Sequence, residues 1–163
     1  MIFPASTSED LLLVAIKERL FTAKAVAMAK HNSGGAVEDR GRERTVILNA
    51  VRLAVKLHLD PEVALKVFTA QIEANKAGQR TFLAKWKGKP AFSNAPDLAK
   101  DVRPKLDALT PKILQGLLRK RYRTASELTA TGIDPVFRPA WNIAVQPLRL
   151  NLNRVKSGHK AVP

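Results

Sequence analysis

The chain has 163 residues, of which 45% are apolar and 26% are charged, a composition typical of a globular domain with one sizeable core. It contains no cysteine, which excludes disulfides, thiolate metal sites and a cysteine nucleophile. The net charge of +14 predicts an anionic partner, but charge alone does not separate a nucleic acid from an acidic membrane surface or a small polyanionic substrate. The longest apolar run, Leu11 to Ile16, is far shorter than the roughly 20 residues of a membrane span. Neither a membrane span nor a signal peptide is predicted, and a mature exported protein would look the same.

Apolar residues at helical spacing predict three long helices, over residues 7–31, 37–59 and 61–86. Ser6 and Glu9 form a capping box before the first helix. Asp60 followed by Pro61 is a strong start signal for the third.

A fourth helix is predicted over residues 98–123, kinked or split at Pro111. A weaker helix from Ala125 and another opening at Asp134 are expected to cover the first four, and residues 153–163 to be frayed. Few runs alternate with period two. The sequence therefore predicts an all-α, single-domain bundle of about six helices over residues 1–163.

Charged and amide side chains occur on helix faces that are otherwise apolar. Arg19 and Lys30 are 11 residues apart, so they point the same way along one helix, about 16 Å apart. For each residue alone, a side chain that reaches solvent from the edge of the face is the more ordinary interpretation. Asp39, Arg42 and Glu43 lie near the start of the second helix, where an ion pair and favourable acids are the ordinary alternative.

The third helix is harder to explain by solvation. Its stripe places three amides between aromatic residues, in the order Phe68, Gln71, Asn75, Gln79, Phe82 and Trp86. A buried amide must be hydrogen-bonded to the protein or to a ligand. These amides, facing arginines and lysines, predict a polar pocket lined by helices.

Other chemistry has little support. The three histidines, His31, His58 and His159, lack metal-ligand spacing. The basic run at residues 119–123 could form a nucleic-acid patch, but a solvated helix end is the preferred interpretation.

These features together resemble the all-helical chorismate mutases, most of all the exported gamma-type subclass. The resemblance spans about residues 8–114 and fades over the C-terminal helices expected in 115–152. Its motifs are E-R-L at Glu18 to Leu20, V-A-x-x-K ending at Lys30, E-D-R-G-R-E at Glu38 to Glu43, L-D-P at Leu59 to Pro61, and V-F-x-x-Q-I-x-A-N-K-x-x-Q from Val67 to Gln79.

The resemblance implies an active site with Lys30, Gln79 and Glu43 as catalytic residues. Its implied substrate-binding residues are Arg19, Arg42, Asp39, Asn75 and Lys112. Lys112 stands where arginine is usual, so two-pronged binding of a carboxylate is less certain there.

The implied reaction is the Claisen rearrangement of chorismate to prephenate, which needs no cofactor or metal. The expected partner is chorismate rather than a nucleic acid or a membrane, in a homodimer with a complete active site in each chain. A periplasmic or secreted location is implied, with a cytoplasmic one left open. Two alternatives remain: an isochorismate lyase of the same fold, and a non-catalytic helical module that binds nucleic acid.

Overall fold

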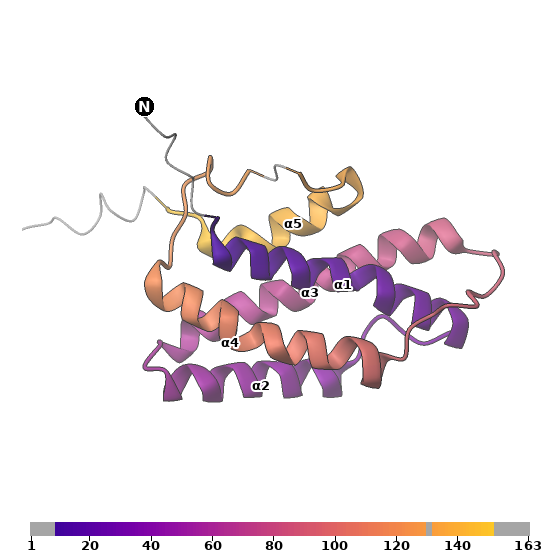
Figure 1. Cartoon of the computed structure of the whole chain (residues 1–163), viewed down its shortest axis with the longest axis horizontal. Helices are drawn as coiled ribbons and strands as arrows, with labels where there is room; N and C mark the ends of the chain where they lie inside the picture. Colours follow the sequence, from indigo (N-terminus) through magenta and orange to yellow (C-terminus); the bar gives the residue numbers. More distant parts are fainter. Residues whose placement is uncertain (1–8, 130–131, 152–163) are drawn as a thin grey trace, which may run out of the picture.

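The computed structural model describes residues 9–129 and 132–151, which form an all-α fold without a β-strand in those ranges. It contains the helices α1 (Leu11–Ser33), α2 (Arg40–Lys56), α3 (Pro61–Trp86), α4 (Arg103–Arg119) and α5 (Arg138–Val145). Helix α3 contacts α1, α2 and α5, while α4 lies against α1 and α2 (Figure 1). The all-α prediction is confirmed, with five α-helices rather than about six. None of the helices described is both long and apolar enough to cross a membrane.

The first two helices are shorter than predicted. Helix α1 begins at Leu11 because the Asp10 carboxylate accepts hydrogen bonds from the next free backbone N–H groups, so Asp10 is the N-cap. The predicted cap, Ser6, lies outside the described residues. Helix α2 begins after Asp39, which caps it, and ends at Lys56 just before His58 adopts a left-handed φ of 60°. The bounds of α3 are as predicted.

The fourth predicted helix is divided, but not at the expected proline. A single π-helical turn, η1 (Leu98–Val102), leads into α4, and Pro111 lies inside α4 without splitting it. The carbonyl that loses its donor to Pro111 belongs to the exposed residue Asp107, where water can hydrate it. Gly116 allows α4 to approach α1, because a Cβ there would lie 2.7 Å from the Leu12 Cβ.

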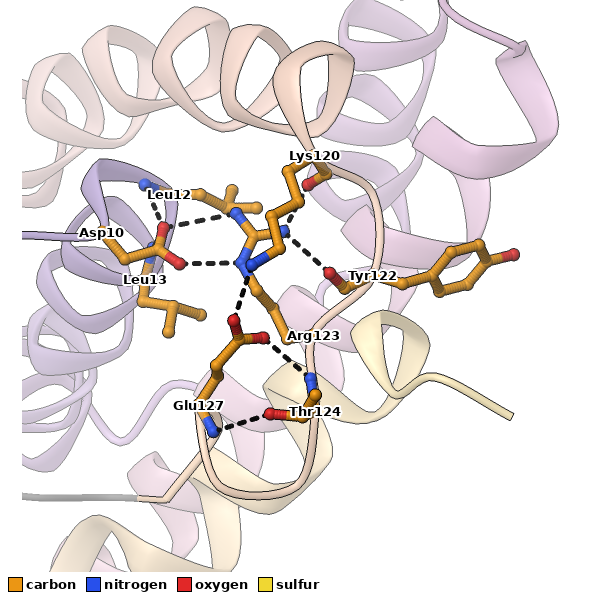
Figure 2. A network of polar contacts seen from close by, with 8 residues as sticks. All are labelled: Asp10, Leu12, Leu13, Lys120, Tyr122, Arg123, Thr124 and Glu127. Atoms are coloured by element: carbon orange, nitrogen blue, oxygen red, sulfur yellow. Dashed lines mark hydrogen bonds and ion pairs between the residues drawn. The ribbon is translucent and has the colours of Figure 1, made fainter. Parts of the chain in front are cut away.

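The segment after α4 is mostly irregular. The helix predicted from Ala125 is wrong, because Thr124 and Glu127 instead close a turn: the Thr124 N–H donates to the Glu127 carboxylate at 2.8 Å, and the Glu127 N–H donates to the Thr124 hydroxyl at 3.2 Å (Figure 2). The helical start at Asp134 is confirmed. It leads through η2 (Pro135–Phe137), α5 and η3 (Gln146–Leu148). The tail predicted to be frayed, 153–163, lies outside the described residues.

Arg123 corrects the interpretation of the basic run as a solvated helix end. It is only 4% exposed, and its Nε lies 2.7 Å from the Asp10 carboxylate. Its Nη1 donates to the backbone carbonyls of Lys120 and Tyr122 (Figure 2). Arg123 therefore fastens the segment after α4 to the N-cap of α1, and it is not available to a nucleic acid.

Candidate active site

A cavity lies between α1, α2, α3 and the start of α4. Its charged and amide lining consists of Arg19, Lys30, Asp39, Arg42, Glu43, Asn75, Lys76, Gln79 and Arg103. Apolar side chains, among them Val26, Val46, Ile72 and Leu106, complete the walls. The fold thus brings together seven of the eight residues that the sequence indicated. It also adds Lys76 and Arg103.

Lys112 is the residue that the structure does not place in this cavity. It lies in a separate hollow between α1 and α4, beside Glu18 and Lys105. The cation of α4 that does line the cavity is Arg103, nine residues earlier. Nine residues correspond to about 2.5 helical turns, so Lys112 points to the opposite side of α4, about 13 Å further along. The sequence offered no local signal for this choice, because Arg103 lies beyond the first turn of the helix predicted over residues 98–123.

Arg19 is a buried cation with no carboxylate within ion-pair distance in the part of the chain that the structure describes. Its side chain is enclosed in the protein, and its Nε has no hydrogen-bond partner among the described residues. The Phe68 ring lies 5.9 Å from its guanidinium carbon. Burial, followed by repulsion from Arg42, lowers the pKa of Arg19 to about 10, so it remains charged at neutral pH. Such an arrangement is costly unless a ligand supplies the anion.

Lys30 begins a chain of polar contacts that crosses the cavity wall. Its Nζ donates to the Gln79 Oε1 at 3.0 Å, and the Gln79 Nε2 donates to the Asn75 Oδ1 at 2.7 Å. Asn75 in turn donates to the Thr22 hydroxyl and to the backbone carbonyl of Arg19. Burial lowers the pKa of Lys30, with nearby carboxylates partly offsetting this effect. Asn75 is thus engaged by the protein, while Gln79 keeps one N–H free to donate.

The other buried amide of the predicted stripe serves the fold. Gln71 donates to the Ala144 carbonyl at 2.9 Å, so it joins α3 to α5 and does not line the cavity.

Lys76 pairs with a carboxylate on the acidic side of the cavity, where Asp39 and Glu43 lie. It was not among the residues that the sequence indicated. The Asp39 carboxylate accepts from the Arg42 N–H as a helix cap, whereas the Glu43 Oε1 lies 2.7 Å from the Lys76 Nζ. Burial lowers the pKa of Lys76, but its hydrogen bonds to carboxylates outweigh burial and raise that pKa overall. A weak signal was present in the spacing, since Lys76 is three residues from both Glu73 and Gln79 and lies on the same side of the helix.

Arg42 is held less firmly. Its Nη2 lies 3.4 Å from the Asp107 carboxylate at an exposed position on α4. Such an exposed ion pair contributes little and yields readily to a better anion. Within the described ranges, no group of histidine and carboxylate side chains is arranged to hold a metal ion.

Comparisons with known proteins point to one family. The sequence profile of the family described as chorismate mutase type II matches residues 7–80. A secreted chorismate mutase from Mycolicibacterium smegmatis is 34% identical over 161 residues, covering 86% of this chain and 88% of the relative. A secreted chorismate mutase from Yersinia pestis is 37% identical over 100 residues, covering 61% of this chain and 54% of the relative.

Solved structures of similar fold are also chorismate mutases. The crystal structure of a chorismate mutase from Burkholderia phymatum superposes with a TM-score of 0.76 at 31% identity, covering 86% of this chain and 94% of that one. The all-helical fold is shared with chorismate mutases, which are isomerases. The chain belongs to the chorismate mutase family.

Proposed function

We propose that this protein converts chorismate to prephenate in the cavity between α1, α2, α3 and α4. The observation that carries the proposal is the buried Arg19 guanidinium, which lines the cavity and has no ion-paired carboxylate within residues 9–129 and 132–151. Chorismate is a dianion, so its carboxylates would supply the missing partner. Arg42 and Arg103 line the same cavity and would hold the substrate with Arg19.

Carboxylate binding would also shape the substrate. The rearrangement forms one carbon–carbon bond between the enolpyruvyl arm and the ring as the ether carbon–oxygen bond breaks, with no proton transfer. The arm must first fold over the ring. Arginines fixed on α1, α2 and α4 would hold both carboxylates in that folded arrangement, which removes much of the entropic barrier.

Lys30 and Gln79 would stabilise the transition state. Negative charge grows on the ether oxygen as its bond to the ring breaks, and preorganised donors at that point lower the barrier. Both side chains lie at the cavity wall and contact each other at 3.0 Å, so one oxygen can reach both. Asn75 would orient Gln79, because it accepts one of its N–H groups.

Glu43 would hold the ring hydroxyl of the substrate by accepting its hydrogen bond, with Asp39 beside it at the start of α2. These anions lie on one side of a cavity otherwise rich in cations. The substrate is therefore oriented as well as bound.

The direct test is to incubate the purified protein separately with chorismate and with isochorismate and to identify the products. Loss of chorismate absorbance with formation of prephenate is expected. Pyruvate released from isochorismate, with chorismate unchanged, would instead favour the lyase alternative.

A matched pair of variants tests the position of the third cation. Arg103→Ala should lower kcat/KM by tenfold or more, because a charge-assisted contact to a carboxylate is lost. Lys112→Ala, on the opposite side of the same helix, should leave kcat/KM within about twofold. A large loss of kcat/KM in Lys112→Ala with little change in Arg103→Ala would show that Lys112 is the substrate-binding cation.

We also propose export and a homodimer with one complete site per chain. The relatives named as secreted support export. Three arginines on three helices of this chain, Arg19, Arg42 and Arg103, line the cavity, which supports a complete site per protomer. Leu48 and Val55 are exposed one heptad apart on α2 and offer an apolar surface to a second copy. Cell fractionation and light scattering of the purified protein test these two points, and a monomer would contradict the second.

A further inference from the structure

We propose that Lys76 is a positioning residue that fixes the Glu43 carboxylate for the ring hydroxyl of the substrate. The inference rests on the proposed function, and it assigns a role to a cavity residue that makes no contribution to carboxylate binding. Lys76 acts through Glu43 and does not itself contact the reacting atoms.

The contacts of Lys76 show why it is not a substrate-binding cation. Its Nζ lies 2.7 Å from Glu43, 2.9 Å from Glu38 and 2.8 Å from Glu73. Three carboxylates at ion-pair distance therefore compensate the single positive charge of Lys76, and its Nζ donates a hydrogen bond to Glu38. The side chain is also only 9% exposed, which leaves it little freedom to turn toward a ligand.

Lys30 provides the contrast within the same cavity. Its Nζ donates to two neutral acceptors, the Gln79 amide and the Val37 carbonyl, and no carboxylate is ion-paired with it among the described residues. The charge of Lys30 is therefore available to an anionic substrate, whereas that of Lys76 is already compensated. Two lysines that line one cavity thus perform different tasks.

Glu43 needs such support because it would lie beside a negatively charged substrate. The Glu43 Oε1 is buried, and a bound chorismate dianion would lie nearby. A carboxylate in that position, without a cation beside it, would be repelled by the substrate. The contact with Lys76 compensates that charge and fixes the direction of the carboxylate.

The geometry also identifies a matched control. Glu73 contacts Lys76 from three residues away on the same helix, but it does not line the cavity. Removing its charge leaves Lys76 with Glu38 and Glu43. Glu73→Gln should therefore leave kcat/KM within about twofold.

A double-mutant cycle tests the proposal. Lys76→Met and Glu43→Gln should each lower kcat/KM by roughly tenfold or more, the loss expected for a displaced charge-assisted hydrogen bond. The double variant should be no worse than the worse single variant, because Lys76 acts only through Glu43. Lys76→Arg should recover most of the activity. Losses that multiply in the double variant, or full activity in Lys76→Met, would overturn the proposal.

Folding and function are separated within the same experiment. Lys76→Met leaves three carboxylates together, so the cycle is repeated in the Glu73→Gln background, where only two remain, and circular dichroism confirms the fold. Wild-type turnover of chorismate is measured alongside. An inactive wild type would contradict the proposed function itself. An active wild type, with losses of kcat/KM that multiply in the double variant, would contradict only the role of Lys76.

Discussion

Two arginines of this protein are equally buried, each 4% exposed, yet their surroundings are opposite. Arg123 is fully engaged by the protein: it contacts the Asp10 carboxylate at 2.7 Å and two backbone carbonyls of its own segment (Figure 2). Arg19 has no carboxylate within ion-pair distance among the described residues, and its Nε is without a partner there. Burial alone therefore does not distinguish a structural cation from a functional one.

The difference shows where the fold tolerates an unfavourable charge. A compensated ion pair fixes one arrangement of the chain, as Arg123 does between α1 and the segment after α4. An uncompensated buried cation lowers stability and is retained where a ligand supplies the anion. The cavity is such a place.

The largest effect is expected from Arg19→Leu. It should lower kcat/KM for chorismate by roughly 10² to 10³ because it removes a preorganised cation from a carboxylate of the substrate. The free energy of unfolding should stay unchanged or increase, since an unpaired buried charge is removed. Steady-state kinetics and urea denaturation measure the two quantities. A variant that is both active and unstable would place Arg19 with Arg123 as a structural residue.

Gln79→Glu should make the reaction depend on pH. The wild-type amide does not titrate, so the rate should be nearly flat across neutral pH. An ionised glutamate would repel the charge developing on the ether oxygen, whereas a protonated one donates to it, so the rate of the variant should rise as pH falls through the new carboxyl pKa. The measurement is a pH profile of chorismate turnover for both forms. A flat profile in a folded variant would mean that Gln79 does not face the ether oxygen.

Arg123→Leu should act on stability instead of chemistry. Its loss leaves the Asp10 carboxylate and two carbonyls without their donor, which should lower the free energy of unfolding by about 2 kcal/mol. Turnover of the folded variant should remain near that of the wild type. Arg121→Leu is the matched control: its guanidinium stacks over the exposed Tyr122 ring at 4.8 Å, and little change is expected. Equal destabilisation by both variants would contradict a special role for Arg123.

The smallest expected effect is a dependence of stability on pH, through the Asp10 carboxylate. Burial raises the pKa of Asp10, but its hydrogen bonds to Arg123 and to backbone N–H groups outweigh burial and lower that pKa overall. A lowered carboxyl pKa contributes stability that is present above the unfolded value of about 4 and is lost as pH falls through the folded value. The difference in unfolding free energy between the wild type and Asp10→Asn should thus be constant from about pH 5 to 8 and shrink below about pH 4. A difference that grows in acid would contradict the pairing with Arg123.

Much of the fold was predictable from local patterns. Apolar spacing and the Asp60–Pro61 start signal were sufficient for α3, whose bounds match the prediction. The first helix was misplaced because two possible caps, Ser6 and Asp10, lie close together and only the tertiary contact with Arg123 favours the second. The helix expected from Ala125 failed because the side chains of Thr124 and Glu127 satisfy the local backbone in a turn.

The part of the site that lies on regular helix faces was predictable from residue spacing and from the family resemblance. Arg19, Lys30, Asn75 and Gln79 lie on two helix faces that the sequence already marked as polar among apolar residues. Arg103 and Lys112 could not be separated by pattern alone, because the choice depends on where α4 begins, and a π-helical turn precedes it. Lys76 was missed because its significance comes from carboxylates on another segment.

The most direct measurement of the central claim is the unfolding free energy of the wild type and Arg19→Leu, each with and without saturating prephenate. Without ligand, the variant should be at least as stable as the wild type. Prephenate should stabilise the wild type by an amount that rises with its concentration, and it should stabilise the variant much less, because a ligand stabilises only the form that binds it. Equal stabilisation of both proteins would contradict the claim that Arg19 is kept unpaired for the substrate.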